Sequence, residues 1–452
     1  MIFKPVLDKN FKPMAVEFKN FTEEAKKSDN HLLEICVERN DGYNYIFSFP
    51  VFSGKAELDR NIKMADRIIK SILWVVGGYK IYIRGDKAIY DNIKKAYSMG
   101  GSREFDKLFM ERVYESEFEV IYCDKDFPKE KKCNLSVGGH LDGCRIGFDA
   151  GGSDRKVSAV IDGKVVYSEE VVWFPKINSD PEYHRKEILA AMRQAASKMP
   201  RVDAIGVSSA GVYVNNKIMV ASLFLKVSDE DFEKKVKTMY IDIANEMGAP
   251  LEVANDGDVT ALAGAIDLGD NEVLGIAMGT SEAVGYINSD GGLNGWLSEL
   301  AFVPVDFDDS AMVDEWSGDY GCGVKYFSQD GVIKLAELGG YKFEDGLSPA
   351  EKLKVIQKLM AEGSPLARQI YEDIGVYLGY TLPFYAMFYD IKHVLLLGRV
   401  TSGEGGNIIM NKAAEVLKEE YPELKFKIEM PDENNRRVGQ SIAAASLAAS
   451  RK

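Results

Sequence analysis

Residues 144–153 read CRIGFDAGGS, an apolar strand that runs directly into a glycine turn and carries Asp149 near its end. Glycines allow a backbone to approach a phosphate group closely, and a carboxylate at a strand end can hold the water shell of Mg²⁺. The following residues predict a second hairpin with Asp162-Gly163 at its tip. A tight hairpin with an exposed aspartate explains the same pattern, so this stretch alone leaves both interpretations open.

Three more polar turns follow apolar strands farther along the chain. Residues 255–258 read NDGD between a strand and a helix, residues 279–281 read GTS, and residues 398–406 read GRVTSGEGG. Each has a purely structural explanation, namely a helix N-cap, a Ser/Thr turn and a surface loop. The turns at 279–281 and 398–406 also fit a phosphate or nucleoside site, because glycine N–H groups, hydroxyls and helix starts bind oxyanions. An N-cap needs only one acid, whereas residues 255–258 offer Asn, Asp and Asp together.

The periodicity of the chain predicts an α/β protein with more than one unit. Residues 1–140 follow the order ββαβαβ, with a hairpin turn at 39–42 and a helical stretch at 86–114. A linker or hairpin is expected at 125–143, where Lys, Gly and Pro are frequent. Beyond it, two strand–turn–strand hairpins far apart in the sequence predict two related halves that face one cleft.

Composition excludes several classes of protein. The chain has 452 residues, 46% of them hydrophobic and 28% charged, so it can bury a sizeable core. A net charge of −14 argues against nucleic acid or an anionic membrane as the main partner, because phosphate surfaces bind clustered Lys and Arg. The five cysteines are scattered without a CxxC pair, so neither a disulfide framework nor a zinc ribbon is indicated. The sequence contains no signal-peptide pattern and no run of about 18 apolar residues, and we therefore expect a cytoplasmic protein.

The order of the polar motifs resembles that of the ROK family of repressors and sugar kinases, within the sugar kinase and actin-like ATPase superfamily. The family's D-x-G-G-T is similar to DAGGS at 149–153, and its E-N-D-A-N to ANDGD at 254–258. Its G-V-P-G turn is similar to the G-x-x-x-x-G segment at 206–211. Its G-T-G-I-G is similar to GTSEA at 279–283, and its G-E-I-G-H-M-P-V to SELAFVPV at 298–305. The likeness covers about two-thirds of the chain, from residue 144 onward.

The resemblance implies an α/β, two-lobed actin-like ATPase fold of the ribonuclease H-like type, with an additional N-terminal α/β domain. That domain would span 1–140 and has no assigned role. The small lobe would span 141–245 together with the terminal helix at 436–452, and the large lobe 246–435. The resemblance further implies ATP- and Mg²⁺-dependent phosphorylation of a hydroxyl on a sugar, amino sugar or polyol, and a homodimer.

The resemblance also assigns a role to each motif residue. Asp256 would accept the proton of the attacking hydroxyl, a task that needs a carboxylate within hydrogen-bond reach. Asp149 would position Mg²⁺ through water, and the acceptor would be bound by Asn255, Glu299 and Gly211. The ATP phosphates and nucleoside would lie against Gly151, Gly152, Ser153, Gly279, Thr280, Ser281, Gly398, Gly403 and Gly405.

The chain departs from the family at the zinc and acceptor positions. The family's zinc-binding C-G-C-G-x-x-G-C pattern is reduced to one cysteine, Cys322, and its partner histidine is Phe302. A tetrahedral zinc site needs four ligands, so we expect no zinc and a rebuilt acceptor pocket. Trp296 and Trp316 flank Glu299 and are explained by core packing or by an aromatic wall for a ring-shaped substrate.

A second function stays open, namely a non-catalytic sensor or scaffold that binds nucleotide or sugar. The lost histidine and cysteine ligands favour the sensor, whereas Asp149, Asp256 and Glu299 favour the enzyme. The N-cap explanation would also retain an acid at 256. A transcriptional repressor, the family's other role, is disfavoured because residues 1–140 are neither basic nor a run of short helices.

Overall fold

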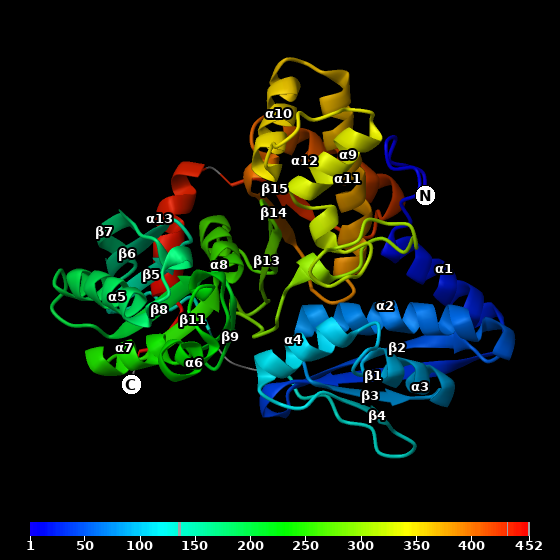
Figure 1. The fold of residues 1–452 in the computed structure, drawn as a ribbon, viewed down its shortest axis with the longest axis horizontal. Coiled ribbons are helices and arrows are strands. Elements are labelled where there is room, and N and C mark those ends of the chain that lie inside the picture. Colours follow the sequence, from blue (N-terminus) through cyan, green and yellow to red (C-terminus); the bar gives the residue numbers. More distant parts are fainter. Residues whose placement is uncertain (134–136, 432, 451–452) are drawn as a thin grey trace.

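The computed structural model describes residues 1–133, 137–431 and 433–450. Its elements gather in three parts, an N-terminal unit, a small lobe with a five-stranded sheet and a large lobe with a four-stranded sheet (Figure 1). Two predicted segments fall partly outside the described residues: 134–136 of the expected linker, and 432 and 451–452 around the expected terminal helix. Within the described ranges, no helix is long and apolar enough to cross a membrane.

The small lobe is built on one mixed sheet with helices on its faces. Its strands are β5 (Cys144–Ala150), β6 (Asp154–Ile161), β7 (Lys164–Val172), β8 (Ala204–Ser209) and β11 (Leu251–Asn255), beside the two-stranded hairpin of β9 (Val212–Val214) and β10 (Lys217–Val220). Its helices are α5 (Pro181–Ala196), α6 (Asp229–Asp231), α7 (Met239–Met247) and α13 (Glu433–Ala445). The strand order is β11-β8-β5-β6-β7; β11, β8 and β5 are parallel, and β5, β6 and β7 are antiparallel. Both hairpins predicted here are confirmed, with Asp162 and Gly163 at positive φ at the tip of the second.

The large lobe carries the second predicted strand–turn–strand hairpin. Its strands are β12 (Val273–Met278), β13 (Glu282–Ile287), β14 (His393–Leu397) and β15 (Lys427–Glu429), and its helices are α8 (Asp256–Leu268), α9 (Gln329–Leu338), α10 (Pro349–Ala361), α11 (Pro365–Tyr385) and α12 (Glu404–Glu420). The order is β13-β12-β14-β15, and the antiparallel β12–β13 pair confirms the hairpin. Helix α8 follows β11 of the small lobe directly and packs on β12 and β13, so it joins the two sheets.

The N-terminal unit has the predicted ββαβαβ order with two additions. Its elements are α1 (Met14–Lys27), β1 (Asn30–Glu38), β2 (Asn44–Phe52), α2 (Leu58–Val76), β3 (Lys80–Arg84), α3 (Lys87–Ala96), α4 (Glu104–Tyr114) and β4 (Glu119–Tyr122). The sheet order is β2-β1-β3-β4. The sequence pattern missed α1, and the helical stretch expected at 86–114 is two helices, α3 and α4.

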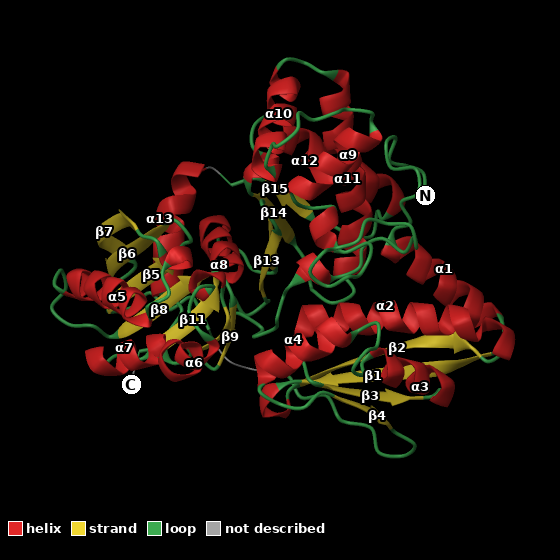
Figure 2. Cartoon of the chain, in the orientation of Figure 1, coloured by secondary structure: helices red, strands yellow, loops and turns green. Residues whose placement is uncertain are grey.

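The N-terminal unit packs firmly on the large lobe (Figure 2). Helix α2 lies between the sheet of the unit and the large lobe, and most of its residues are buried. The chain before α1 lies on α11, where the backbone N–H groups of Val6 and Leu7 donate to the Asp373 carboxylate at 2.9 and 2.7 Å. One continuous apolar core therefore spans the unit and the large lobe, whereas the small lobe has a core of its own.

Candidate active site

The register of the small-lobe sheet brings three motif segments to one edge. Asp149 on β5 pairs with Ser208 on β8, and Ser209 pairs with Asn255 on β11. Because these strands are parallel, their carboxyl ends meet at the same edge, where ligands of open α/β sheets bind. The Ser208 hydroxyl donates to Asp149 Oδ1 at 2.9 Å, which orients the carboxylate.

The second acidic motif forms the start of helix α8. Asn255 is the N-cap: its Oδ1 accepts from the Gly257 N–H at 2.7 Å, and its Nδ2 donates to the Gly211 carbonyl at 2.8 Å. Asp256 is the first helical residue, and its Oδ1 also accepts from the Gly257 N–H, at 3.0 Å. N-capping therefore explains Asn255. It does not require the second acid, Asp256, because one residue is enough to cap the helix.

Helix α8 can lie this close to the second sheet only because two glycines meet there. A Cβ on Gly257 would lie 2.7 Å from the Val284 carbonyl oxygen of β13, and a Cβ on Gly285 would lie 2.2 Å from the Gly257 carbonyl oxygen. Any larger residue at either position would push the helix away. The close approach places the start of α8 against the hairpin that carries Gly279, Thr280 and Ser281.

Burial and mutual repulsion raise the pKa values of the acids around the start of α8. Burial, and then the charge of Asp256, raises the pKa of Asp149 to about 6. Burial, followed by repulsion from Asp256 and Asp258, raises the pKa of Glu299 to about 7. Burial also raises the pKa of Asp256 itself. The repulsion places Asp149 and Glu299 near the carboxylate of Asp256 at the start of α8. Carboxyl groups with raised pKa values are typical of acid–base sites.

The two glycine turns have different surroundings. In the first turn, the Gly151 carbonyl accepts from Trp173 Nε1 at 2.8 Å, and a Cβ on Gly152 would lie 2.9 Å from Lys176 Nζ. Ser153, the last residue of this turn, donates its hydroxyl to Asp154 at 2.9 Å. In the second turn, a Cβ on Gly279 would meet no atom closer than 3.8 Å, and Thr280 and Ser281 are exposed. The turns thus leave room for phosphate oxygens, with the Lys176 ammonium group beside the first.

The late glycine-rich segment forms a groove beside α12. Gly398 has φ +95°, and its Cβ would lie 2.3 Å from the Met278 carbonyl oxygen, so only glycine fits after β14. Gly403 is the N-cap of α12, and Gly405 lies against the ring of Tyr371. A groove of about 340 Å³ opens here, between the start of α12 and side chains of α10 and α11. The Tyr371 hydroxyl is buried without a hydrogen-bond partner in the described part of the chain.

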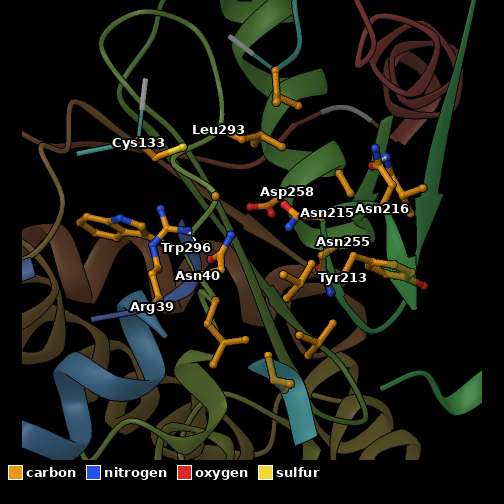
Figure 3. A pocket seen from close by; sticks show the side chains of 18 of the residues that line it. Arg39, Asn40, Cys133, Tyr213, Asn215, Asn216, Asn255, Asp258, Leu293 and Trp296 are labelled. Carbon is orange, nitrogen blue, oxygen red and sulfur yellow. Dashed lines mark hydrogen bonds between the residues drawn. The ribbon is translucent and has the colours of Figure 1, made fainter. Parts of the chain in front are cut away.

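A cavity of about 140 Å³ lies beside the start of α8, and the N-terminal unit forms one of its walls. Figure 3 shows Arg39, Asn40 and Trp296 on one side of it, and Asn255, Asp258 and the β9–β10 hairpin on the other. Gly211 also lines it, and its contact with a substrate stays a prediction. The sequence analysis missed the contribution of Arg39 and Asn40. The hairpin turn at 39–42 was recognised, but no local pattern relates it to residues more than 200 positions away.

The comparison with known proteins settles the family. The ROK family profile matches residues 145–449. This chain belongs to the ROK family. A ROK hexokinase from Thermus thermophilus is similar in structure, with 16% identity and a TM-score of 0.51, over 67% of this chain and 97% of that chain. A ROK transcriptional regulator, a homologue of the E. coli MLC protein, is similar with 17% identity and a TM-score of 0.50, over 68% of this chain and 79% of that chain. No curated protein matches the sequence.

The ROK fold inferred from the motif order is therefore confirmed, together with the additional N-terminal α/β unit. The family contains sugar kinases and regulators, and both kinds are among the similar structures. The roles of the individual site residues remain predictions, and they are argued below as a proposal.

The segment that carries zinc ligands in the ROK pattern is built differently here. Cys322 is buried, and its nearest polar contacts are oxygens of Asp319 and Tyr320 at 3.9 Å. Phe302 packs against the Trp74 ring of α2, with ring centroids 4.3 Å apart. Among the described residues, no group of three His, Cys, Asp or Glu side chains is arranged to hold a metal ion. The expectation that the protein binds no zinc stays a prediction.

The two tryptophans near Glu299 have different surroundings. Trp296 lines the cavity, packs edge-on against Tyr45 of β2 and contacts Tyr389. Trp316 is 76% exposed, so the core-packing explanation is wrong for this residue. It lies on a polar loop whose hydrogen bonds come from Asp314, Ser317 and Asp319 instead.

Proposed function

We propose that this ROK protein transfers the γ-phosphoryl group of ATP, with Mg²⁺, to a hydroxyl of a sugar, an amino sugar or a polyol. The observation that carries the proposal is the position of Asp256. It starts α8, between two sheets that each contribute a glycine turn, and its charge acts on both Asp149 and Glu299. Phosphoryl transfer depends mainly on positioning and charge neutralisation, which a converging cleft of this kind supplies.

Asp256 is the proposed general base. Its carboxylate would accept the proton of the attacking hydroxyl while the hydroxyl oxygen bonds to the γ-phosphorus and the bond to ADP breaks. Burial raises the pKa of Asp256, which makes its carboxylate a better proton acceptor than an exposed aspartate. The hydrogen bond from the Gly257 N–H fixes the orientation of Oδ1.

The residues present fit ATP and Mg²⁺. Asp149 supplies the carboxylate oxygen that Mg²⁺ prefers, and Mg²⁺, when bound, neutralises charge on the ATP phosphates. The exposed edges of Gly151–Ser153 and Gly279–Ser281 leave space for those phosphates. The groove at Gly403 and Gly405, which follow the Gly398 strand end, would take the nucleoside. The Tyr371 hydroxyl, which has no hydrogen-bond partner among the described residues, would be available for a polar contact.

The acceptor would occupy the cavity beside α8, whose lining includes Asn255 and the Gly211 turn. Glu299 is not among the residues that line this cavity, so its proposed contact with the acceptor rests on the family resemblance. Asn255 ties the Gly211 carbonyl to the helix start, so the two residues hold one wall in place. The expected lobe boundary at 245/246 would separate β11 from the sheet with which it pairs, so in this proposal the small lobe extends through β11 and includes α13, and the large lobe begins with α8. Closure of the lobes on the acceptor would exclude water and limit futile hydrolysis of ATP.

The test is ADP release from Mg·ATP over a panel of hexoses, amino sugars, polyols and their charged derivatives. Asp256→Asn removes the base and keeps the side-chain shape, so turnover should fall about 100- to 10,000-fold. Asp267→Asn, at an exposed position on the same helix, is the matched control and should keep full activity. Turnover that survives in Asp256→Asn would remove Asp256 from its role.

Absence of turnover with every acceptor would overturn the kinase. If nucleotide or sugar still raised the melting temperature, the protein would be the sensor that the sequence left open. Melting curves of both variants without ligand show whether a loss of activity comes from a loss of fold.

A further inference from the structure

The N-terminal unit completes the cavity in which the acceptor would bind. Arg39 and Asn40 follow β1 at the hairpin turn, and Tyr114 ends α4; all three line the cavity that also contains Asn255 and Asp258. Asp258 lies two residues after the proposed base on the same helix. A side chain of the N-terminal unit can therefore contact the part of the acceptor that does not react.

Arg39 is a buried cation without an acidic partner. Its side chain is 4% exposed, and in the described part of the chain no carboxylate lies within ion-pair distance of its guanidinium group. The other buried arginines of the described chain each pair with a carboxylate: Arg67 with Asp319, Arg103 with Asp66, Arg145 with Asp142, and Arg155 with Glu187. Arg39 is thus the exception in a protein that otherwise neutralises its buried arginines.

The guanidinium group of Arg39 is held in position by neutral groups alone. Its Nη1 donates to Asn40 Oδ1 at 3.3 Å, and its Nη2 donates to the Asn294 carbonyl at 3.2 Å. The Tyr43 ring lies 5.2 Å from Cζ, a cation–π contact. These two long hydrogen bonds use part of a set of five N–H donors. A fixed guanidinium with spare donors is suited to bidentate binding of a planar or tetrahedral oxyanion.

A buried charge without a counter-ion is costly, because water has been removed and no opposite charge replaces it. An anion in the cavity would supply that counter-charge. A neutral sugar would not supply it, because its hydroxyls carry no charge. The charge of Arg39 therefore indicates that the ligand is anionic.

We propose that Arg39 binds an anionic substituent, a carboxylate or a phosphate, on the acceptor whose hydroxyl is phosphorylated. The inference rests on the proposed kinase function. It gives the N-terminal unit a role, which is to select acidic sugars or polyols over their neutral counterparts. Carboxylate and phosphate both offer negatively charged oxygens that a guanidinium can bind with two N–H donors. The experiment distinguishes the two groups.

The acids of the cavity are compatible with such a ligand. Glu252 and Asp258 also line it, and burial raises the pKa of each to about 7. Near neutral pH a substantial fraction of each is therefore uncharged and can donate to acceptor hydroxyls. Arg39 lies across the cavity from Asp258, so the anionic end of the acceptor faces the cation and the hydroxyl end faces α8 (Figure 3).

The test measures binding to the full-length protein without nucleotide, by calorimetry or by thermal shift. The probes are glucose, gluconate, glucuronate, glucose 6-phosphate, N-acetylglucosamine and N-acetylglucosamine 6-phosphate. We expect at least one acid or phosphate to bind about 10- to 100-fold more tightly than its neutral parent, the range expected for charge-assisted hydrogen bonds. Gluconate and glucuronate report on a carboxylate, and the two phosphates report on a phosphate. Equal binding of every acid and its neutral parent would overturn the proposal.

Variants assign the preference to Arg39. Arg39→Gln should abolish the preference and leave the affinity for ATP unchanged, whereas Arg39→Lys, which keeps the charge without the fork of donors, should retain part of it. Arg112→Gln, at an exposed position of the same unit, is the control and should behave as wild type. A preference that persists in Arg39→Gln would overturn the assignment. If Arg39→Gln fails to fold, Arg39→Lys decides, because undiminished anion binding in that variant would contradict bidentate recognition.

Binding and turnover fail independently. If the acid binds through Arg39 and no ADP forms, the kinase proposal fails and the anion site stands. If neutral acceptors are phosphorylated with no advantage for acids, the kinase stands and the anion site fails.

Discussion

At the scale of single residues, Glu282 has a raised pKa and lies in the second glycine hairpin. It starts β13 directly after the Gly279–Ser281 turn, and its side chain is 3% exposed. Oε1 accepts from the Tyr385 hydroxyl at 3.4 Å, and Oε2 has no hydrogen-bond partner among the described residues. Burial, followed by repulsion from Glu299, raises its pKa to about 8. Glu282 is therefore mostly protonated at neutral pH and packs as a neutral group beneath the acceptor site.

This protonation predicts a pH dependence of stability. The folded protein holds the Glu282 proton up to about pH 8, whereas the unfolded chain releases it near 4.5, the ordinary pKa of a glutamate side chain. The unfolded state binds fewer protons in between, so the free energy of unfolding falls as pH rises through this window. Glu282→Gln keeps the neutral shape. It should flatten the decline of the melting temperature between pH 5 and 8, by a few degrees. Glu419→Gln, at an exposed position, should keep the wild-type slope; an unchanged slope in Glu282→Gln would contradict the assignment.

At the scale of elements, helix α2 holds the loop that carries Ser298 and Glu299. Its last turn has carbonyl groups without partners inside the helix. The carbonyls of Trp74 and Val75 accept from the N–H groups of Glu299 and Ser298, at 3.0 and 2.9 Å. Farther back on α2, Arg67 and Lys70 pair with the buried Asp319 at 2.6 and 2.9 Å. One helix of the N-terminal unit thus fixes both Glu299 and the segment that carries zinc ligands in the ROK pattern.

The ion cluster around Asp319 predicts a large loss of stability on removal of its anion. Arg67, Lys70 and Arg103 all lie within 2.9 Å of the Asp319 carboxylate, and these charges hold its pKa far below its usual range. Asp319→Asn leaves three buried cations around a neutral amide, which should cost about 3–5 kcal/mol of unfolding free energy in urea titrations. Asp309→Asn, whose side chain is 76% exposed in its pair with Lys63, should cost less than about 1 kcal/mol. Equal effects of the two changes would show that the ion pairs of Asp319 do not contribute more to stability than an exposed pair.

At the scale of the whole molecule, the sequence predicts those features that depend on neighbouring residues. Short-range chemistry determines the strand ends, the glycine turns and the helix that starts at Asp256. The order of these motifs therefore predicts the two hairpins of the two sheets. Contacts between distant segments leave no such pattern. The hydrogen bond from Arg39 to Asn294 spans 255 positions, and Phe302 gives no sign that its partner is Trp74. The wall of the cavity, and with it the role of the first unit, became visible only in the fold.

The distribution of apolar cores predicts how the molecule unfolds. Phe11 packs on Tyr326 and Tyr377 in the core shared by the N-terminal unit and the large lobe, whereas Ile205 is buried in the separate core of the small lobe. Scanning calorimetry should therefore resolve two transitions. Phe11→Ala should lower only the larger transition and Ile205→Ala only the smaller, at costs of about 3–5 and 2–5 kcal/mol.

The same experiment tests whether the N-terminal unit and the large lobe unfold as one cooperative unit. Two transitions would mean that the small lobe can unfold while the N-terminal unit stays docked, and that the core shared by α8 and α13 does not couple the lobes. A nucleotide that bridges the lobes would then raise the smaller transition more, since it binds only when that lobe is folded. A single transition lowered equally by both variants would instead mean that α8 and α13, which share a third core across the lobes, couple all three parts into one cooperative unit. The acceptor cavity would then be rigid before any ligand arrives, and selection by Arg39 would operate on a preformed site.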